Sequence, residues 1–279
     1  MTESKKRIKP STIVIYAFLI FMVIIYIAPI VWIAMSSVKT RAQIYKAPFD
    51  LPVEFHWENY QIAWSAGKLG IAMLNSLFVC VITLILTMLI GSMAAFAIGR
   101  MRWKLSGATM IYILIGMMIP VHCVLIPLFV RFANIGLNNN LWGLIIPYLT
   151  FSLPTCVFIM SGFFRSIPNE LLESACMDGC TIYQIFFKIC FPLARTGLFV
   201  TGLMTFIGNW NELLLALVFV SDANKKTLPV ALTKFVTPYQ TNYDKMFPAI
   251  MIAIIPTIVV YCLFSNQIVD GLTTGAVKG

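Results

Sequence analysis

The chain reads Arg165-Ser-Ile-Pro-Asn-Glu-Leu-Leu-Glu-Ser-Ala-Cys-Met-Asp-Gly-Cys-Thr-Ile-Tyr-Gln-Ile-Phe-Phe-Lys-Ile-Cys-Phe-Pro-Leu-Ala-Arg195 between two long apolar runs. This stretch is too polar to cross lipid, but it is strongly patterned. Pro168 suits the first turn of a helix, and Glu170 and Glu173 follow near the positive end of that helix. Gly179 is expected to stop it. The sequence therefore predicts a short helix that ends in a glycine turn.

A second helix is expected directly after this turn. Thr181 is followed three residues later by Gln184, which is the spacing of a capping box. Four apolar residues then fall on one helix face at i, i+3, i+4 and i+7, namely Ile182, Ile185, Phe186 and Ile189. Pro192 is expected to end the helix. The pattern predicts an amphipathic helix folded back on the ends of a helix bundle.

The composition places that bundle in a membrane. Of 279 residues, 59% are hydrophobic and 11% are charged, whereas soluble domains have about 45–50% and about 25%. This excludes a water-soluble globular protein and a disordered one. The net charge of +9 is attributed to anchoring at the membrane edge, because the charges lie between apolar runs. No nucleic-acid partner is expected.

Six apolar runs are long enough to span a bilayer, which takes about 20 residues. The expected spans are residues 13–35, 71–98, 107–130, 141–164, 196–220 and 248–264. The first is too long for the apolar part of a cleavable signal peptide, which has about 7–15 residues, and should stay as an anchor. The prolines at 120, 127, 147, 154 and 256 are expected to bend their helices.

The distribution of Lys and Arg orients the spans. The N-terminal tail and the turn Arg100-Met-Arg-Trp-Lys104 are dense in positive charge, which predicts that both lie in the cytoplasm. An even number of spans then places both termini there. Residues 39–69 and 222–247 are expected as irregular outer segments, with four aromatic residues at the interface: Trp57, Trp64, Tyr239 and Tyr243.

Metal and catalytic chemistry find little support in the sequence. The seven cysteines are an odd number, so no disulfide framework is expected. Cys176 and Cys180 can share a helix face, but no histidine completes a metal site near them. His56 and His122 are the only histidines, and His122 is interpreted as structural. No catalytic residue, metal or cofactor is therefore expected in this chain.

The loop spacing resembles a known family. The loop contains Glu173-Ser-Ala175, then Gly179, then nine residues, then Ile189-x-Phe-Pro192. This spacing resembles the EAA loop of permease subunits in ATP-binding-cassette (ABC) importers. The pattern of that family is E-A-A, three residues, G, nine residues and I-x-L-P. Ser174 and Phe191 are the departures, and both are mild. The resemblance implies an all-α protein with six transmembrane helices, the type I ABC importer permease fold.

In that family the first helix of the loop is a coupling helix, which docks in a groove of a cytoplasmic ATPase. The residues implied in coupling are Glu173, Ser174, Ala175, Asp178, Gly179, Ile189 and Pro192. Because the chain has no phosphate-binding G-x-x-x-x-G-K-[ST] loop, ATP must be bound by partner subunits. The alternative is an amphipathic connector that lies on the membrane surface.

Other stretches look like the shorter partner of a permease pair in carbohydrate uptake of the maltose type. They include Ser37-Val-Lys-Thr40, Trp57-Glu-Asn-Tyr60, Asn209-Trp-Asn-Glu212, Thr227-Leu-Pro-Val230 and the Gly-rich end from Gly271 to Gly279. This implies a multi-pass protein of the bacterial cytoplasmic (inner) membrane that moves a sugar or oligosaccharide. The implied partners are membrane lipid, a second related permease, two ATPase subunits and an extracellular or periplasmic solute-binding protein.

The expected organisation is an anchor helix and outer segment over residues 1–70, a permease core over 71–268 with the coupling loop at 165–195, and a cytoplasmic tail over 269–279. The expected substrate path consists of Asn209, Trp210, Asn211 and Glu212. Their amide and carboxylate groups suit sugar hydroxyls, and the indole suits stacking on a sugar face. Asn209 and Glu212 can share a helix face, whereas Asn211 points elsewhere. The alternative role is hydrogen bonding between helices.

Three other functions stay open at this point. A phosphorylated polyol is a possible substrate within the same branch of permeases. A secondary transporter could couple to protons through Glu212, the only carboxylate placed within a span, but it would not need the patterned loop. An intramembrane hydrolase would need catalytic groups, and no H-E-x-x-H is present.

Overall fold

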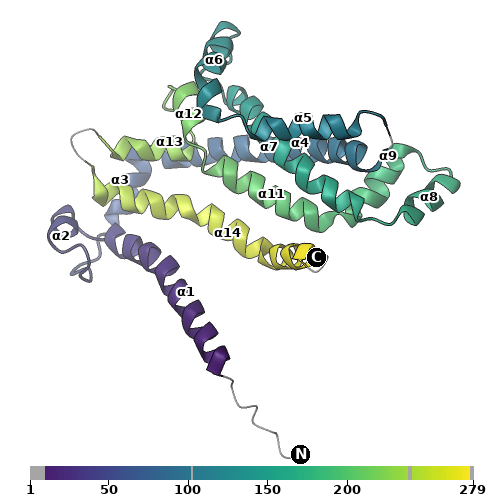
Figure 1. Cartoon of the computed structure of the whole chain (residues 1–279). Coiled ribbons are helices and arrows are strands. Elements are labelled where there is room, and N and C mark those ends of the chain that lie inside the picture. Colours follow the sequence, from purple (N-terminus) through teal and green to yellow (C-terminus); the bar gives the residue numbers. More distant parts are fainter. Residues whose placement is uncertain (1–9, 102, 238–240, 277–279) are drawn as a thin grey trace, which may run out of the picture. The chain divides into compact units, whose positions relative to one another are not determined.

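The computed structural model describes residues 10–101, 103–237 and 241–276, and the regular secondary structure of these residues is helical apart from one isolated bridge between Val236 and Thr241. They divide into two compact units (Figure 1). The first comprises Met1–Gly67 and Lys234–Ile252, and the second comprises Lys68–Thr233 and Ala253–Gly279.

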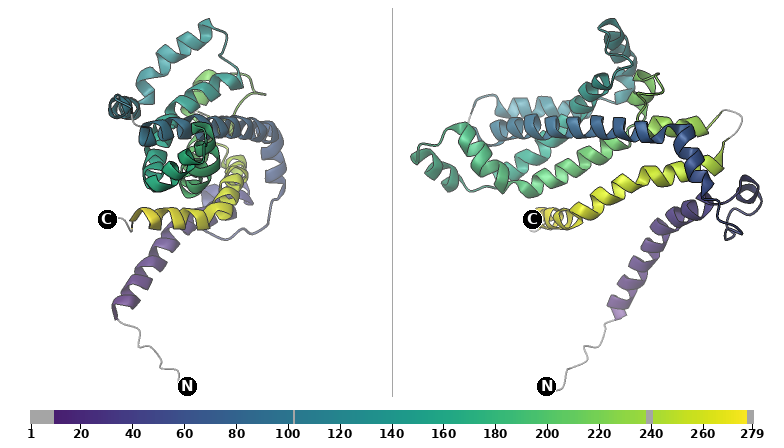
Figure 2. Two further views of the ribbon diagram at one scale, coloured as in Figure 1. Left: turned by 90° about the vertical axis from the view of Figure 1, so that its right-hand side faces the viewer. Right: turned by 180° about the vertical axis from the view of Figure 1, so that it is seen from behind.

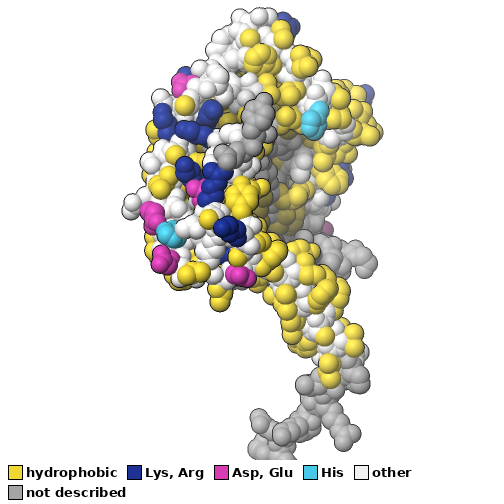
Figure 3. Space-filling view, turned by 90° about the vertical axis from the view of Figure 1, so that its left-hand side faces the viewer, with side chains coloured by type: hydrophobic (Ala, Val, Ile, Leu, Met, Phe, Trp, Pro, Cys, Tyr) yellow, Lys and Arg dark blue, Asp and Glu magenta, His cyan; other side chains and the backbone are white. Residues whose placement is uncertain are grey.

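The first unit is built on α1 (Pro10–Ser37), a helix of 28 residues that includes Pro29. At 1.5 Å per residue it is about 42 Å long, enough to cross a bilayer. Hydrophobic side chains are exposed along most of the helix, from Ile13 to Val31, and Figure 3 shows them on the face in view, as expected of a helix whose solvent is lipid or another membrane helix. At its end, Trp32 packs edge to face on Phe247 with ring centroids 5.3 Å apart.

The two segments predicted to be irregular contain regular helices, so that part of the prediction is wrong. Residues 39–69 contain α2 (Arg41–Lys46) and α3 (Glu58–Gly67), and residues 222–247 contain α13 (Leu228–Leu232), a 3₁₀ turn η2 (Thr233–Phe235) and the start of α14 (Tyr243–Ala276). Short caps stabilise these helices: Thr40 Oγ1, for example, accepts from the Gln43 N–H. Trp57 and Trp64 are exposed, Tyr243 is half-buried, and Tyr239 lies outside the described residues.

The second unit is a helix bundle around the pair α4 and α7, which lie side by side (Figure 2). Its helices are α4 (Leu69–Arg100), α5 (Ser106–Met117), α6 (Val121–Asn134), α7 (Leu141–Arg165), α8 (Asn169–Met177), α9 (Ile182–Gln184), the π-helical η1 (Ile185–Cys190), α10 (Phe191–Leu193), α11 (Arg195–Trp210), α12 (Leu214–Phe219), α13 and the part of α14 from Ala253 on. A Cβ at Gly91 of α4 would lie 2.5 Å from Cys156 Sγ of α7. The absent side chain lets the two helices approach closely.

The predicted spans are confirmed as helices in four places. By length and composition α1, α4, α7 and α14 are each able to cross a membrane, and two bent helix pairs raise the total to as many as six. One bent pair is α5 and α6, which meet at 90° just before Pro120. The third span is therefore not one continuous helix, because the proline has no N–H to donate across the break.

The fifth predicted span is also broken. The helix of residues 196–220 stops at Trp210 and begins again at Leu214. The other prolines behave differently from Pro120, because α6, α7 and α14 continue through Pro127, Pro147, Pro154 and Pro256. Membrane helices tolerate such prolines because groups on neighbouring helices bond the carbonyl oxygens that the proline leaves without a partner.

Candidate functional site: the connecting loop and the broken fifth span

The first helix of the loop ends as its sequence predicts. α8 is followed by Gly179 with φ +78°, where a Cβ would meet nothing within 4 Å. The Cys180 N–H donates to the Ala175 carbonyl and the Gly179 N–H donates to the Cys176 carbonyl, both at 3.0 Å. These two bonds form a Schellman motif. A glycine is needed at such a turn either for a left-handed backbone or for close packing. At Gly179 the reason is the left-handed backbone, because no atom lies close enough to exclude a side chain.

The second helix begins with the predicted capping box. The Thr181 N–H donates to Gln184 Oε1 at 2.8 Å, and the Gln184 N–H donates to Thr181 Oγ1 at 3.4 Å. The two side chains thus accept from the N–H groups of Thr181 and Gln184, which have no partner within the first turn of the helix itself. The loop therefore has a well-defined stop and start, only a few residues apart.

The rest of the second helix differs from the prediction. Residues 185–190 are π-helical, and the helix continues through Pro192 to Leu193, so Pro192 does not end it. The Phe191 N–H donates to the Phe186 carbonyl, five residues back. This wider turn moves the buried face, because a π-helix has more residues per turn than the α-helix on which the prediction relied. Cys190 is buried in place of Ile189, which is half-buried, and Ile182 is exposed.

An aromatic cluster anchors the loop to the bundle. Phe186 is 3% exposed, and its ring centroid lies 5.3 Å from that of Phe96 in α4 and 6.0 Å from that of Phe164 in α7. Phe96 and Phe164 themselves pack edge to face at 5.8 Å. Arg100 Nη2 adds a 2.6 Å hydrogen bond to the Ile167 carbonyl. The ends of two long helices and the loop therefore share one hydrophobic core.

The predicted coupling residues occupy two different environments. Glu173, Ser174, Asp178, Gly179 and Pro192 are exposed, Ile189 is half-buried, and Ala175 is 5% exposed in the core with Ile185 and Phe186. α8 therefore has one face that packs on the bundle through Ala175 and another that carries the carboxylates. The exposed face is free to meet a partner.

Glu212 lies at the break in the fifth span. Its Oε2 accepts from Tyr148 Oη of α7 at 2.6 Å and from the Ala216 N–H at 3.1 Å, and its Oε1 accepts from the Leu215 N–H at 2.7 Å. The carboxylate thus satisfies two free N–H groups at the start of α12 and ties that helix to α7. This is the arrangement that the helix-bonding alternative describes.

The other predicted path residues are not grouped around Glu212. Trp210 is 2% exposed, stacks on Phe206 at 5.7 Å, and donates from Nε1 to the Ala253 carbonyl at 3.3 Å. Asn211 is exposed and donates to the Ile207 carbonyl at 3.0 Å. Asn209 Nδ2 is buried and has no hydrogen-bond partner among the described residues. Sequence reasoning missed Tyr148, because nothing in its local sequence points to a partner 64 residues away.

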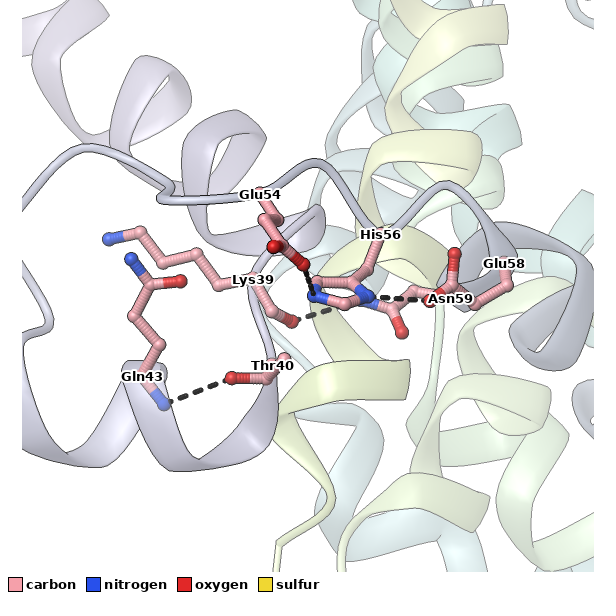
Figure 4. A network of polar contacts seen from close by, with 7 residues as sticks. All are labelled: Lys39, Thr40, Gln43, Glu54, His56, Glu58 and Asn59. Carbon is pink, nitrogen blue, oxygen red and sulfur yellow. Dashed lines mark hydrogen bonds and ion pairs between the residues drawn. The ribbon is translucent and has the colours of Figure 1, made fainter.

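A polar network in the first unit was also missed (Figure 4). Lys39 is fully buried, and its Nζ donates to the Pro48 carbonyl at 3.0 Å. Asn59 Nδ2 donates to the Ser37 and Lys39 carbonyls, and the ring of His56 lies between Glu54 and Glu58, with Nδ1 2.6 Å from Glu58 Oε1. A backbone hydrogen bond and then the hydrogen bond with His56 lower the pKa of Glu58. These contacts hold the segment that follows α1.

The sequence is similar to permease subunits of uptake systems. It is 35% identical over 94% of its length to the diacetylchitobiose uptake system permease protein NgcG of Streptomyces coelicolor, of which 88% is covered. It is 34% identical over 90% of its length to the trehalose transport system permease protein SugB of Mycobacterium tuberculosis, of which 92% is covered.

The fold matches a solved transporter chain as well. A chain of a bacterial ABC transporter involved in the import of the acidic polysaccharide alginate aligns with a TM-score of 0.80 and 24% identity, over 94% of this chain and 99% of that one. Residues 87–275 match the family described as "Binding-protein-dependent transport system inner membrane component". This segment contains the connecting loop, the aromatic cluster and the broken fifth span. The chain therefore belongs to the family of inner membrane components of binding-protein-dependent transport systems.

Proposed function

We propose that this protein is the permease subunit of an ABC importer that moves a sugar or oligosaccharide across the bacterial cytoplasmic membrane, with ATP hydrolysed by separate chains. The observation that carries the proposal is the loop of residues 165–195. Its helix α8 exposes carboxylates on one face, and the rest of the loop packs on the ends of α4 and α7 in one hydrophobic core. The uptake functions printed for NgcG and SugB support a carbohydrate as the substrate.

The proposed chain crosses the membrane six times, with both termini in the cytoplasm. The count takes the bent pair α5 and α6 as one span and α11 with α12, on either side of the break after Trp210, as another. Residues 1–70 form the anchor and outer segment, residues 71–268 the permease core, and residues 269–279 the tail. In this topology the exposed Cys176 of α8 faces the cytoplasm. The exposed Ala223 faces the outside of the cell.

Cysteine labelling tests this topology. A membrane-impermeant maleimide should label Ala223→Cys in intact cells and should label Cys176 only after the membrane is opened. The chain with Cys176→Ser controls for reaction at the other cysteines. Labelling of Cys176 in intact cells would contradict both the topology and the assignment of the loop as a coupling element, since a cytoplasmic ATPase has to reach it.

In the proposed mechanism the loop converts closure of two ATPase subunits into movement of the bundle. The exposed face of α8, with Glu173 and Asp178, docks on the ATPase. Because Phe186 packs on Phe96 and Phe164, displacement of the loop passes to α4 and α7. A second, related permease completes the pathway, and a solute-binding protein delivers the sugar. Alternation between inward and outward access then follows the nucleotide state.

Within the path we propose distinct roles for the polar residues at the break. Glu212 holds α12 against α7 through Tyr148. The buried Asn209 amide, which lacks a partner among the described residues, is the group available for a sugar hydroxyl. Trp210 is packed against Phe206 and supports the helix rather than the sugar. Asn209→Ala should weaken transport with little loss of assembly, whereas Asn211→Ala, on an exposed side chain, serves as the matched control.

The complex itself provides the decisive experiment. The affinity-tagged chain should copurify with an ATPase and a second permease, and the reconstituted complex should hydrolyse ATP faster when a solute-binding protein and its sugar are added. A panel of di- and oligosaccharides with a phosphorylated polyol identifies the substrate class. A chain that purifies alone and shows proton-dependent uptake instead would overturn the proposal.

A further inference from the structure

A cationic hollow lies beside the coupling loop, lined by residues at the end of α4, the start of α5, the end of α7 and the start of α8. Its volume is about 680 Å³. The residues that line it are Ile98, Gly99, Arg100, Met101, Trp103, Lys104, Ser106, Arg165 and Asn169. Three of these are cations and none is a carboxylate, so the hollow is suited to an anion.

The cations have no anionic partner within the described part of the chain. The ion pairs found there involve only His56 with Glu54 and Glu58. Arg100 is partly buried and makes one hydrogen bond, to the carbonyl of Ile167. Arg165 of α7 lies beside Gly99 at the end of α4, where a Cβ on this glycine would be in ordinary van der Waals contact, 3.7 Å from Arg165 Cγ. The positive charges of two helices are thereby brought together and left uncompensated.

The first turn of α8 adds unused hydrogen-bond donors. Asn169 lines the hollow and is the first residue of this nine-residue helix. Its N-cap residue is Pro168, which provides no side-chain hydrogen bond. The first N–H groups of a helix favour an oxyanion when no side chain caps them. Guanidinium, ammonium and amide donors together match the oxygens of a phosphate group.

The surroundings identify the source of that phosphate as the membrane. Trp103 is 41% exposed and Met101 is 44% exposed beside the cations, and Trp103 Nε1 donates to the Ala97 carbonyl at 3.0 Å. Exposed tryptophan is characteristic of the headgroup level of a bilayer. The hollow also lies at the end of α4, a helix long and apolar enough to cross the membrane. Cations at this depth attract anionic lipid.

We propose that this hollow binds the headgroup of an anionic phospholipid, with the phosphate on Arg100, Lys104 and Arg165 and the acyl chains beside Trp103 and Met101. Such a lipid would contact the base of α8 through Asn169. It would therefore stabilise the loop in the position from which α8 meets its partner. The proposal requires only that α4 and α7 end at the membrane surface. The lipid proposal and the proposed function are independent, so either one can be wrong while the other is correct.

Trp103 provides the reporter for the test. The purified complex is titrated in detergent with phosphatidylglycerol or phosphatidylcholine that carry the same brominated acyl chains, which quench nearby indoles. The signal of Trp103 is the difference between the unchanged chain and Trp103→Phe. Each cation near a membrane surface favours anionic lipid about fivefold. With three cations on the phosphate, we therefore expect phosphatidylglycerol to quench at a concentration about 125-fold lower than phosphatidylcholine.

The variants separate the hollow from general surface charge. Lys104→Gln and Arg165→Gln should each reduce the preference about fivefold, and the double variant should leave only the preference of about fivefold that Arg100 provides. Both side chains are exposed, so folding should be preserved, and size-exclusion chromatography checks it. Arg100 is left unchanged because it bonds the Ile167 carbonyl. Lys188→Gln, which removes an exposed cation outside the hollow, should keep the full preference.

Four outcomes would overturn the proposal. The first is equal quenching by the two lipids, and the second is a preference that the double variant leaves unchanged. The third is loss of the preference when inorganic phosphate is added at the concentration of the lipid, which would make the ligand a free anion. The fourth is a preference that appears only after the ATPase is stripped away, which would assign the hollow to an acidic surface of that partner.

Discussion

Substitution of Gly179 separates backbone strain from docking at the coupling loop. Gly179 has φ +78° in the Schellman motif, and nothing lies within 4 Å of a Cβ placed there. A side chain therefore costs conformational energy rather than a clash. For Ala this cost is about 1 kcal/mol, which lowers the equilibrium constant for forming the native turn about fivefold. Asn costs less, because it adopts the left-handed conformation more readily.

Gly179→Glu carries the strain of Ala and also projects a charged side chain from the exposed face. If that face docks on an ATPase, Gly179→Glu should abolish copurification of the ATPase, whereas Gly179→Ala and Gly179→Asn should retain at least about a fifth of it. Glu173→Lys reverses a charge on the same face. Its defect should be partly relieved by a compensating change on the ATPase rather than elsewhere in this chain.

The assay is sugar-stimulated ATP hydrolysis in reconstituted complexes, measured beside copurification of the ATPase and insertion of the chain in the membrane. Insertion should be unchanged in all four variants, because the loop lies outside the spans. If Gly179→Glu and Glu173→Lys keep normal association and full stimulation, the coupling assignment is wrong. The loop would then be the amphipathic connector that its sequence also allows.

Five further substitutions test the packing that supports the site. Phe186→Ala should destabilise the loop by about 3–5 kcal/mol and speed hydrogen exchange in α8, whereas Phe187→Ala, at a ring that is 46% exposed, should cost about 1 kcal/mol or less; equal effects would contradict the aromatic anchor. Thr181→Ala should destabilise the second helix by about 1 kcal/mol, because the cap is lost. Gln184→Ala should destabilise it by a similar amount in the same hydrogen-exchange measurement. Glu212→Ala should lower stability in detergent unfolding by about 1 kcal/mol or more, and a neutral result would show that the break needs no carboxylate.

Local signals in the sequence were sufficient for the stops and starts of the helices. Gly179 as the end of α8 and the capping box of Thr181 with Gln184 are confirmed, because each depends on hydrogen bonds between residues at most five apart. The apolar runs likewise located α1, α4, α7 and α14. Side chains that face lipid need only be apolar, so hydropathy alone identifies such helices.

The contacts between distant residues were decided only by the tertiary structure. The π-helical turn moved the buried face from Ile189 to Cys190, because Phe186 has to meet Phe96 and Phe164 from other helices. The break after Trp210 is held by Glu212 with Tyr148, and no local pattern records a bond across 64 residues. A span of 20 apolar residues specifies how long a helix can be, but the partners of its few polar groups depend on which helices pack beside it.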